Sequence, residues 1–323
     1  MRNKPILILC GEPNSIFSEI LVKSINNYKT KKPIILIGSY KLLKSQFKQL
    51  KMKLILNQIF LKNNKVFNLK LNRVNILNVD YKFKKPFEKI SSKSNKYIEE
   101  CFQKCFRIIK YNDIAGLING PISKKTFLKK NFQGITEYLS NKFNIKDKFA
   151  MLIFNKSLSV SPITTHLPIS KVSKNLDKKD IILKTILIND FYKKYFHIRP
   201  KFAVCGLNPH CENFFDKSEE LRIIKPAIKN LIKKKINIDG PFPADTVFMK
   251  NILNKYNVII GMYHDQVLAP IKTLYNFDAI NITLGLPILR ISPDHGPNFE
   301  MLGKNKSNSK SLSESIRFLD KIK

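Results

Sequence analysis

Side chains that could bind anions and transfer protons gather in one stretch of the sequence, from Val258 to Glu300. After a short apolar run of strand length come four hydrogen-bonding side chains in a row, Tyr263, His264, Asp265 and Gln266. Three more polar residues follow at intervals of 9 residues, in separate turns or strand ends: Lys272, Asn281 and Arg290. The stretch closes with Asp294, His295 and Gly296. Lysine and arginine suit phosphate and carboxylate groups, so the pattern predicts one wall of an active site for an anionic substrate.

Three of the five histidines, His166, His210 and His264, each follow an apolar run of strand length. In open α/β sheets ligands bind just beyond the carboxyl ends of the strands, so the three imidazoles can converge there. Three histidines that leave an open coordination position form a catalytic metal site. Hydrogen-bonded loop histidines are the alternative. Cys211, beside His210, is a further candidate ligand, although free buried thiols are the ordinary state of cysteines in a reducing cytoplasm.

The elements that would position these residues alternate between strands and helices. Strands are predicted at 5–10, 33–38, 115–118, 150–154, 157–163, 201–205 and 258–262. Helices are predicted at 18–27, 91–110, 178–195, 219–234 and 311–323, with another that opens at Gly134. Residues 50–90 are interpreted as irregular strands and loops, and 240–246 as a rigid loop. The β-α-β opening indicates an α/β protein whose parallel sheet is covered by helices. No glycine-rich dinucleotide motif follows the first strand, so nothing indicates a Rossmann site.

The 323 residues and 43% hydrophobic content are those of one large or two medium globular domains. No apolar run is long enough to span a membrane, and the first residues resemble a strand rather than a signal peptide, so a cytoplasmic location is expected. The formal charge of +34 comes mostly from lysines spread along the whole chain. This favours compositional drift over a specific nucleic-acid site, with a polyanion-binding role as the alternative. The charge would still steer small anions toward the protein.

Eight ordered segments, NGPISK, GITEYL, TTHLP, GLNPH, GPFPADT, YHDQ, NITLGLP and DHG, resemble the 4-hydroxythreonine-4-phosphate dehydrogenase family of pyridoxal 5'-phosphate biosynthesis. The resemblance implies an isocitrate/isopropylmalate dehydrogenase-like fold of two interlocked α/β/α domains with mostly parallel sheets. Residues 1–128 with 258–323 would form one discontinuous domain and 129–257 the other, with the active site in the cleft between them. It also implies a homodimer whose metal site lies near the subunit interface.

The same resemblance implies the reaction and its site residues. The family oxidises 4-phosphooxy-L-threonine with NAD or NADP and one divalent metal per subunit (zinc, magnesium or cobalt), and the β-keto acid decarboxylates to 3-amino-2-oxopropyl phosphate. The metal ligands would be His166, His210 and His264. The substrate-binding residues would be Thr136, Lys272, Asn281 and Arg290.

Other roles stay open. Asp245 and Asp265 are candidates for proton transfer or for orienting a ligand, with structural capping as the alternative. Asp294 and His295 would orient cofactor or substrate, or stabilise a turn.

The sequence also departs from the family pattern. The family's GHTE segment reads Gly134-Ile135-Thr136-Glu137 here, so Ile135 replaces a substrate-binding histidine. The opening GDPxGIGPE reads GEPNSIFSE. Related enzymes that oxidise 4-phospho-threonate are one alternative function, and an inactive or merely basic binding relic is another. Retention of all three histidines argues against the relic.

Overall fold

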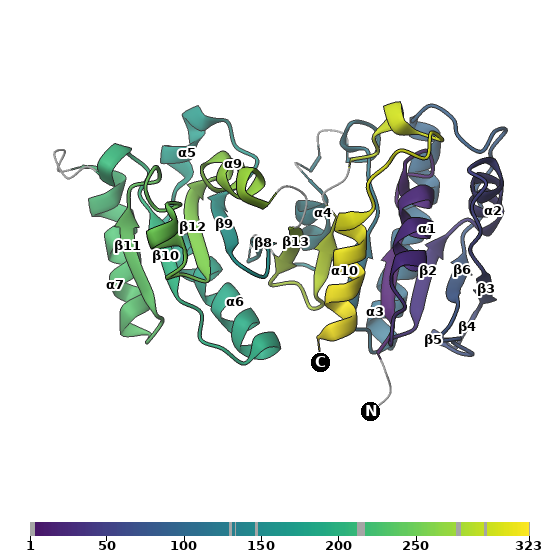
Figure 1. Ribbon diagram of the computed structural model, residues 1–323, viewed down its shortest axis with the longest axis horizontal. Coiled ribbons are helices and arrows are strands. Elements are labelled where there is room, and N and C mark those ends of the chain that lie inside the picture. Colours follow the sequence, from purple (N-terminus) through teal and green to yellow (C-terminus); the bar gives the residue numbers. More distant parts are fainter. Residues whose placement is uncertain are drawn as a thin grey trace. The chain divides into compact units, whose positions relative to one another are not determined.

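The computed structural model describes residues 4–128, 131–132, 134–145, 148–211, 217–275, 279–293 and 296–322. The chain folds into two compact units (Figure 1). Unit 1 comprises Met1–Leu139 and Pro287–Lys323, and unit 2 comprises Ser140–Leu286. Within the described ranges no helix is both long and apolar enough to cross a membrane.

Unit 1 is built on six parallel strands in the order β14-β7-β1-β2-β6-β3. Their bounds are Ile6–Leu9 (β1), Ile34–Gly38 (β2), Leu56–Ile59 (β3), Val74–Asn78 (β6), Gly116–Asn119 (β7) and Arg290–Ser292 (β14). A separate hairpin pairs β4 (Leu61–Lys62) with β5 (Lys65–Val66). The central strand β1 is an uninterrupted apolar run with every residue buried, as expected for a parallel strand covered on both faces.

Helices cover the strands of unit 1. Their bounds are Phe17–Asn27 (α1), Tyr40–Gln49 (α2), Asn95–Tyr111 (α3), Ile135–Lys142 (α4, which continues into unit 2) and Lys310–Lys321 (α10). Short turns of helix are Ser92–Ser94 (η1), Lys124–Leu128 (η2, a π-helix) and Phe299–Met301 (η5). Helices α3 and α10 both pack on β1, and α1 packs against α10 (Figure 1).

Unit 2 is built on six strands in the order β11-β10-β12-β9-β8-β13. Their bounds are Ala150–Phe154 (β8), Ser159–Thr164 (β9), Phe202–Cys205 (β10), Ile238–Phe242 (β11), Val258–Tyr263 (β12) and Ile280–Leu284 (β13). The first four strands of this order are parallel, whereas β8 is antiparallel to β9 and β13. Strands β9, β10 and β12 therefore end at the same edge of the sheet.

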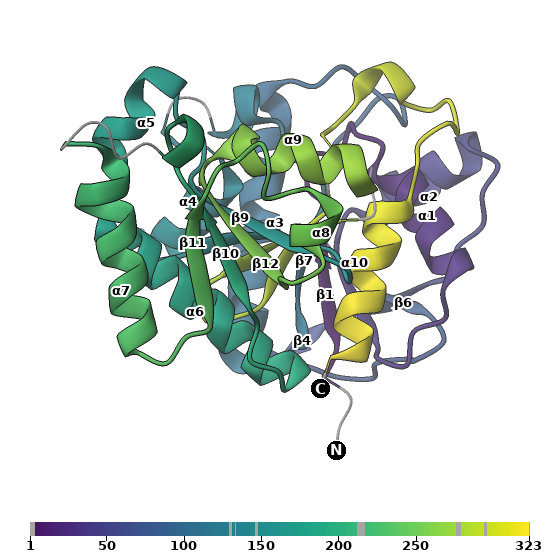
Figure 2. The same cartoon turned by 60° about the vertical axis from the view of Figure 1, so that its left-hand side comes forward.

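The helices of unit 2 are Ile169–Asn175 (α5), Lys178–Phe196 (α6), Lys225–Lys233 (α7), Lys250–Leu253 (α8) and His264–Tyr275 (α9). Short turns are Pro209–Cys211 (η3) and Glu220–Ile224 (η4, a π-helix). Helix α6 packs on β8, β9 and β13, and α9 packs on β9 and β12 (Figure 2). Helix α6 begins after Asp177, whose side chain accepts a hydrogen bond from the backbone N–H of Lys179 and so caps the helix.

The predicted α/β class with mostly parallel strands is confirmed by this architecture. Three local expectations were wrong. Both predicted domain boundaries were wrong: residues 129–139 lie in unit 1, and residues 258–286 lie in unit 2 because β12 pairs with β9 and β10. Residues 240–242 belong to β11, in which Phe242 pairs with Cys205 of β10. Lys272 lies inside helix α9 instead of at a turn or strand end.

A close approach of two strand ends shapes the loop after β1. The backbone N–H of Gly120 donates to Leu9 O over 2.7 Å, and that of Glu12 donates to Pro121 O over 2.8 Å. Gly11 has φ +76°, and a Cβ placed on it would lie 2.3 Å from Pro121 O. Only glycine fits this conformation and this spacing without strain.

Side-chain hydrogen bonds hold the rest of the GEPNSIFSE loop. The buried Glu12 carboxylate accepts from Ser94 Oγ at 3.0 Å and from the backbone N–H of Asn14 at 3.3 Å. Ser15 Oγ donates to Glu12 O over 2.7 Å. Burial raises the pKa of Glu12, and the two hydrogen bonds oppose that rise. The loop that departs from the family pattern is therefore ordered by its own polar side chains together with Ser94.

Gly11→Ala should lower the free energy of unfolding by about 1–3 kcal/mol, because a Cβ at positive φ is strained and would meet a backbone oxygen. Chemical denaturation with unchanged m-value would measure the loss. Gly296→Ala is the matched control, since nothing lies within 4 Å of a Cβ at that position. Equal midpoints for the two variants would contradict the close approach.

Candidate functional site

The three predicted histidines follow three neighbouring parallel strands of unit 2. His166 comes two residues after β9, His264 directly after β12, and His210 in the short turn η3 after β10. In the sheet β12 lies between β9 and β10. The ring centroids of His166 and His264 are 6.2 Å apart. The fold thus brings two of the imidazoles together and puts the third at the end of an adjacent strand.

His264 is oriented by the residue next to it. Its Nδ1 lies 2.6 Å from Asp265 Oδ1. A carboxylate on one ring nitrogen fixes the ring and leaves Nε2 as the nitrogen that could coordinate an ion. The Asp265 side chain is 79% exposed, so this orientation is only partly shielded from solvent.

His210 lies on a turn of unusual backbone geometry. His210 and Cys211 both have φ +56°, which is the left-handed region that non-glycine residues seldom adopt. The Cys211 thiol is buried, and its pKa is raised mainly by that burial, with the nearby Glu220 and Asp245 carboxylates adding to the rise. A ligand role for Cys211 stays a prediction from the sequence. Asp245 itself is exposed and follows β11.

The donor set fits a divalent metal in its chemistry. Neutral imidazole is a common ligand of zinc and cobalt, and the ring centroids of His166 and His264 lie 6.2 Å apart. Within the described ranges, no three His, Cys, Asp or Glu side chains already stand in ligating positions. His166 and His210 are both exposed, which leaves their rings room to turn toward an ion.

A second group of predicted residues meets in unit 1. Arg290, at the start of β14, is 3% exposed. Its Nε donates to Asn119 Oδ1 over 2.7 Å, and its Nη1 donates to Thr136 Oγ1 over 3.1 Å. Asn119 ends β7, which pairs with β14, and Thr136 lies in the first turn of α4. Burial lowers the pKa of Arg290 to about 10, and the Glu137 carboxylate opposes that shift. The guanidinium stays charged at neutral pH.

The other predicted residues have varied settings. Ile135 is buried at the start of α4. Asn281 lies in β13, and its buried Oδ1 has no hydrogen-bond partner in the part of the chain that the structure describes. Lys272 is exposed on α9. Asp294 and His295 lie outside the described residues.

Three contributors to these groups were not singled out as site residues from the sequence. Asn119 holds Arg290, and its signal was its place at the end of the strand before Gly120-Pro121. Gln266 joins the ends of β10 and β12, and it stood in the polar row after the apolar run. Glu220 accepts the backbone N–H groups of the turn before His210, but it gave no signal because it lies inside a predicted helix.

A mostly parallel α/β sheet with histidines after strand ends and a buried arginine is an arrangement typical of an α/β enzyme. Comparisons with known proteins agree. Residues 29–319 match the family "Pyridoxal phosphate biosynthetic protein PdxA". The chain therefore belongs to the PdxA family, whose members are oxidoreductases of pyridoxine biosynthesis.

Individual relatives cover nearly the whole chain. A 4-hydroxythreonine-4-phosphate dehydrogenase of Sulfurihydrogenibium sp. is 35% identical over 316 residues, which is 96% of this chain and 96% of the relative. A D-threonate 4-phosphate dehydrogenase of Salmonella typhimurium is 29% identical over 326 residues, 98% of each chain. The crystal structure of 4-hydroxythreonine-4-phosphate dehydrogenase from Klebsiella pneumoniae matches with a TM-score of 0.85 and 26% identity, covering 98% of this chain and 97% of that one.

Arg290→Lys should lower kcat/KM for the phosphorylated substrate about tenfold to a hundredfold. Lysine keeps the charge but cannot reach Asn119 and Thr136 while presenting a planar fork to an anion. Arg199→Lys is the matched control, because Arg199 is exposed. Initial rates at varied substrate concentration would measure both variants. Equal values would mean that the fork contributes nothing.

Proposed function

We propose that the chain oxidises 4-phosphooxy-L-threonine with NAD or NADP and with the help of one divalent metal per subunit. The C3–H hydrogen leaves as hydride to the nicotinamide, and the C3 hydroxyl loses a proton. The resulting β-keto acid releases carbon dioxide to give 3-amino-2-oxopropyl phosphate. The metal dependence is supported by one observation: His166, His264 and His210 each follow one of three adjacent parallel strands.

Arg290 and Thr136 are proposed to bind an anionic end of the substrate. The guanidinium is already desolvated and fixed by two hydrogen bonds, so little further ordering is needed when phosphate or carboxylate arrives. Lys272 would add positive charge. Asn281 would donate or accept a hydrogen bond, and its Oδ1, unpartnered among the described residues, supports that role.

The histidines are proposed to hold the metal through their imidazole nitrogens, with Asp265 orienting His264. A divalent cation held there would lower the pKa of a neighbouring hydroxyl and stabilise negative charge that develops during decarboxylation. Asp245 would remain a candidate for proton transfer, since its exposed carboxylate follows β11 beside the His210 turn.

The dinucleotide is proposed to bind loops outside a glycine-rich motif, because none follows β1. Asp294 and His295 would help to orient it or the substrate. A homodimer with the metal near the subunit interface and a cytoplasmic location complete the proposal. The family's activity requires no nucleic acid and no membrane, and the scattered lysines give no reason to add either.

Purified protein should form NADH or NADPH from 4-phosphooxy-L-threonine only while a divalent metal is present. Chelation should abolish the absorbance change at the nicotinamide band, and added zinc, cobalt or magnesium should restore it. Elemental analysis should find one metal per subunit in the wild type and none in His210→Ala.

The matched control is His197→Asn, because His197 caps the C-terminus of α6 at φ +58° and asparagine tolerates that conformation. This variant should keep both metal and turnover. Turnover that survives thorough chelation would refute the metal-assisted reaction, and metal-loaded wild type without turnover would favour the relic.

A 4-phospho-threonate substrate is the second candidate. The favouring observation is that an apolar side chain, Ile135, stands beside Thr136 where the family has a substrate-binding histidine. The Salmonella relative named for D-threonate 4-phosphate also aligns over nearly all of the chain.

Ile135→His should raise kcat/KM for 4-phosphooxy-L-threonine about tenfold to a hundredfold if it restores a hydrogen bond to a charged group. Ile135→Leu serves as the control, since it keeps an apolar side chain at this buried position. The ratio of kcat/KM for the two substrates would be measured in each variant. A fall in activity on 4-phosphooxy-L-threonine, with wild-type preference for 4-phospho-threonate, would make the second candidate correct.

A further inference from the structure

A chain of buried hydrogen bonds runs across the ends of the three strands that precede the histidines. Thr164 Oγ1, at the end of β9, donates to Met262 O of β12 over 2.7 Å. Gln266 Oε1 accepts from Met262 N over 2.6 Å, and Gln266 Nε2 donates to Gly206 O, just after β10, over 2.8 Å. The amide of Gln266 and the hydroxyl of Thr164 therefore join β9, β12 and β10 at one edge of the sheet.

Glu220 extends the chain into the turn that carries His210. One carboxylate oxygen accepts from Leu207 N at 2.7 Å and from Asn208 N at 2.8 Å, and the other accepts from Asn208 Nδ2 at 2.8 Å. Glu220 has no solvent exposure. A buried carboxylate is tolerated only when it is fully hydrogen-bonded, so the turn and the carboxylate depend on each other.

Two glycines, Gly206 and Gly261, lie so close to this region that it leaves no room for a side chain on them. A Cβ on Gly206 would lie 3.0 Å from Glu220 Oε1 and 2.7 Å from Cys211 Sγ. A Cβ on Gly261 would lie 3.1 Å from Gln266 Oε1 and 2.5 Å from Val267 Cγ1. Alanine at either position would therefore displace Cys211 or Val267 and press on Glu220 or Gln266.

Each histidine lies two residues after a member of this chain: His166 after Thr164, His264 after Met262, and His210 after Asn208. The backbone two residues before each imidazole is therefore held by a hydrogen bond. Thr164 and Met262 bond to each other across β9 and β12, and Asn208 bonds to Glu220. The tie matters most at His210, because its left-handed conformation is costly unless the surrounding structure imposes it.

We propose that Thr164, Gln266 and Glu220 are positioning residues that set the mutual placement of His166, His210 and His264, and thereby the affinity of the site for a divalent metal. The proposal rests on the proposed metal-binding role of the three histidines. The three positioning residues are buried or nearly so, and none would touch the ion itself. Their effect would pass through the backbone, in the manner of groups that orient metal ligands from behind.

The test is the affinity of the apoprotein for Co²⁺, followed by its visible absorption. Thr164→Val removes only the hydroxyl and should weaken binding about tenfold, whereas Thr164→Ser keeps a hydroxyl and should restore it. Gln266→Leu removes both links to Met262 and Gly206 and should weaken binding up to about a hundredfold, with an altered Co²⁺ spectrum.

Tyr192→Phe is the matched control. It deletes another buried hydrogen bond of unit 2, from Tyr192 Oη to Ser159 Oγ over 2.8 Å, at the opposite end of β9. It should lower stability to a degree comparable with Thr164→Val while leaving Co²⁺ affinity and spectrum unchanged. If Gln266→Leu does not fold, the Thr164→Val and Thr164→Ser pair still decides the question.

The outcomes separate this inference from the proposed function. Co²⁺ binding that is lost in His166→Ala but unchanged in Thr164→Val and Gln266→Leu would overturn the positioning role alone. Equal weakening in Tyr192→Phe and Thr164→Val would also overturn it, because general destabilisation would then suffice. Wild-type protein that binds no Co²⁺ would overturn both the metal site and its positioning.

Discussion

Parallel pairing of β9, β12 and β10 is the constraint on which the candidate metal site depends. Parallel strands end at the same edge of a sheet, so residues that follow them are neighbours whatever their separation in the sequence. The centroid distance of 6.2 Å between His166 and His264 is the direct result. Strands that are held only by their pairing can still slide and twist slightly relative to one another. Buried side chains such as Gln266, which bond to the backbone of two strands at once, remove that freedom.

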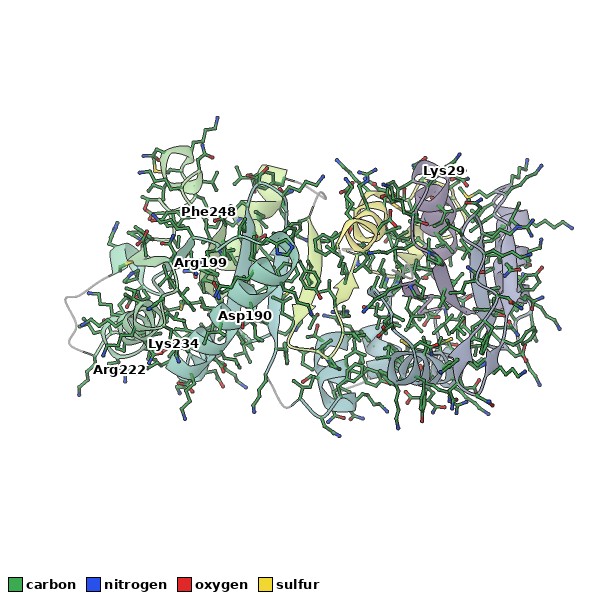
Figure 3. All side chains as sticks on the ribbon, turned by 90° about the horizontal axis from the view of Figure 1, so that it is seen from below. Lys29, Asp190, Arg199, Arg222, Lys234 and Phe248 are labelled. Carbon is green, nitrogen blue, oxygen red and sulfur yellow. The ribbon has the colours of Figure 1, made fainter. Side chains whose placement is uncertain are left out.

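In each unit a buried charged side chain orders the structure around it. In the described part of the chain, Arg290 is the only lysine or arginine whose side chain is buried, although basic side chains lie all along both units in Figure 3. Removing a guanidinium or a carboxylate from water is costly unless hydrogen bonds replace the lost solvation. Arg290 has Asn119 and Thr136, and Glu220 has the turn before His210. Each ion therefore holds a rigid local structure, and rigid polar groups favour catalysis because they need no reorganisation.

The surface lysines differ from these buried groups in their solvation. Exposed charges are solvated and screened by salt, so their number changes long-range attraction more than fold or site geometry. A +34 charge would attract anions of any kind toward the protein, whereas selection among them would rest with a few desolvated groups. The substitution at Ile135 matters for that reason, because it alters the buried setting next to Thr136 rather than the surface.

Sequence by itself determined the α/β class and most element positions, since apolar runs such as Ile6–Leu9 and helical periodicity are local signals. It also selected His166, His210, His264 and Arg290 as candidates. Tertiary structure alone decided which strand lies beside which, that residues 258–286 join unit 2, and that Arg290 meets Thr136. It alone revealed Glu220, because an acidic residue in a helix looks solvated until the fold brings the turn of a distant strand onto it. Such contacts depend on pairings between remote segments, and local pattern carries no information about them.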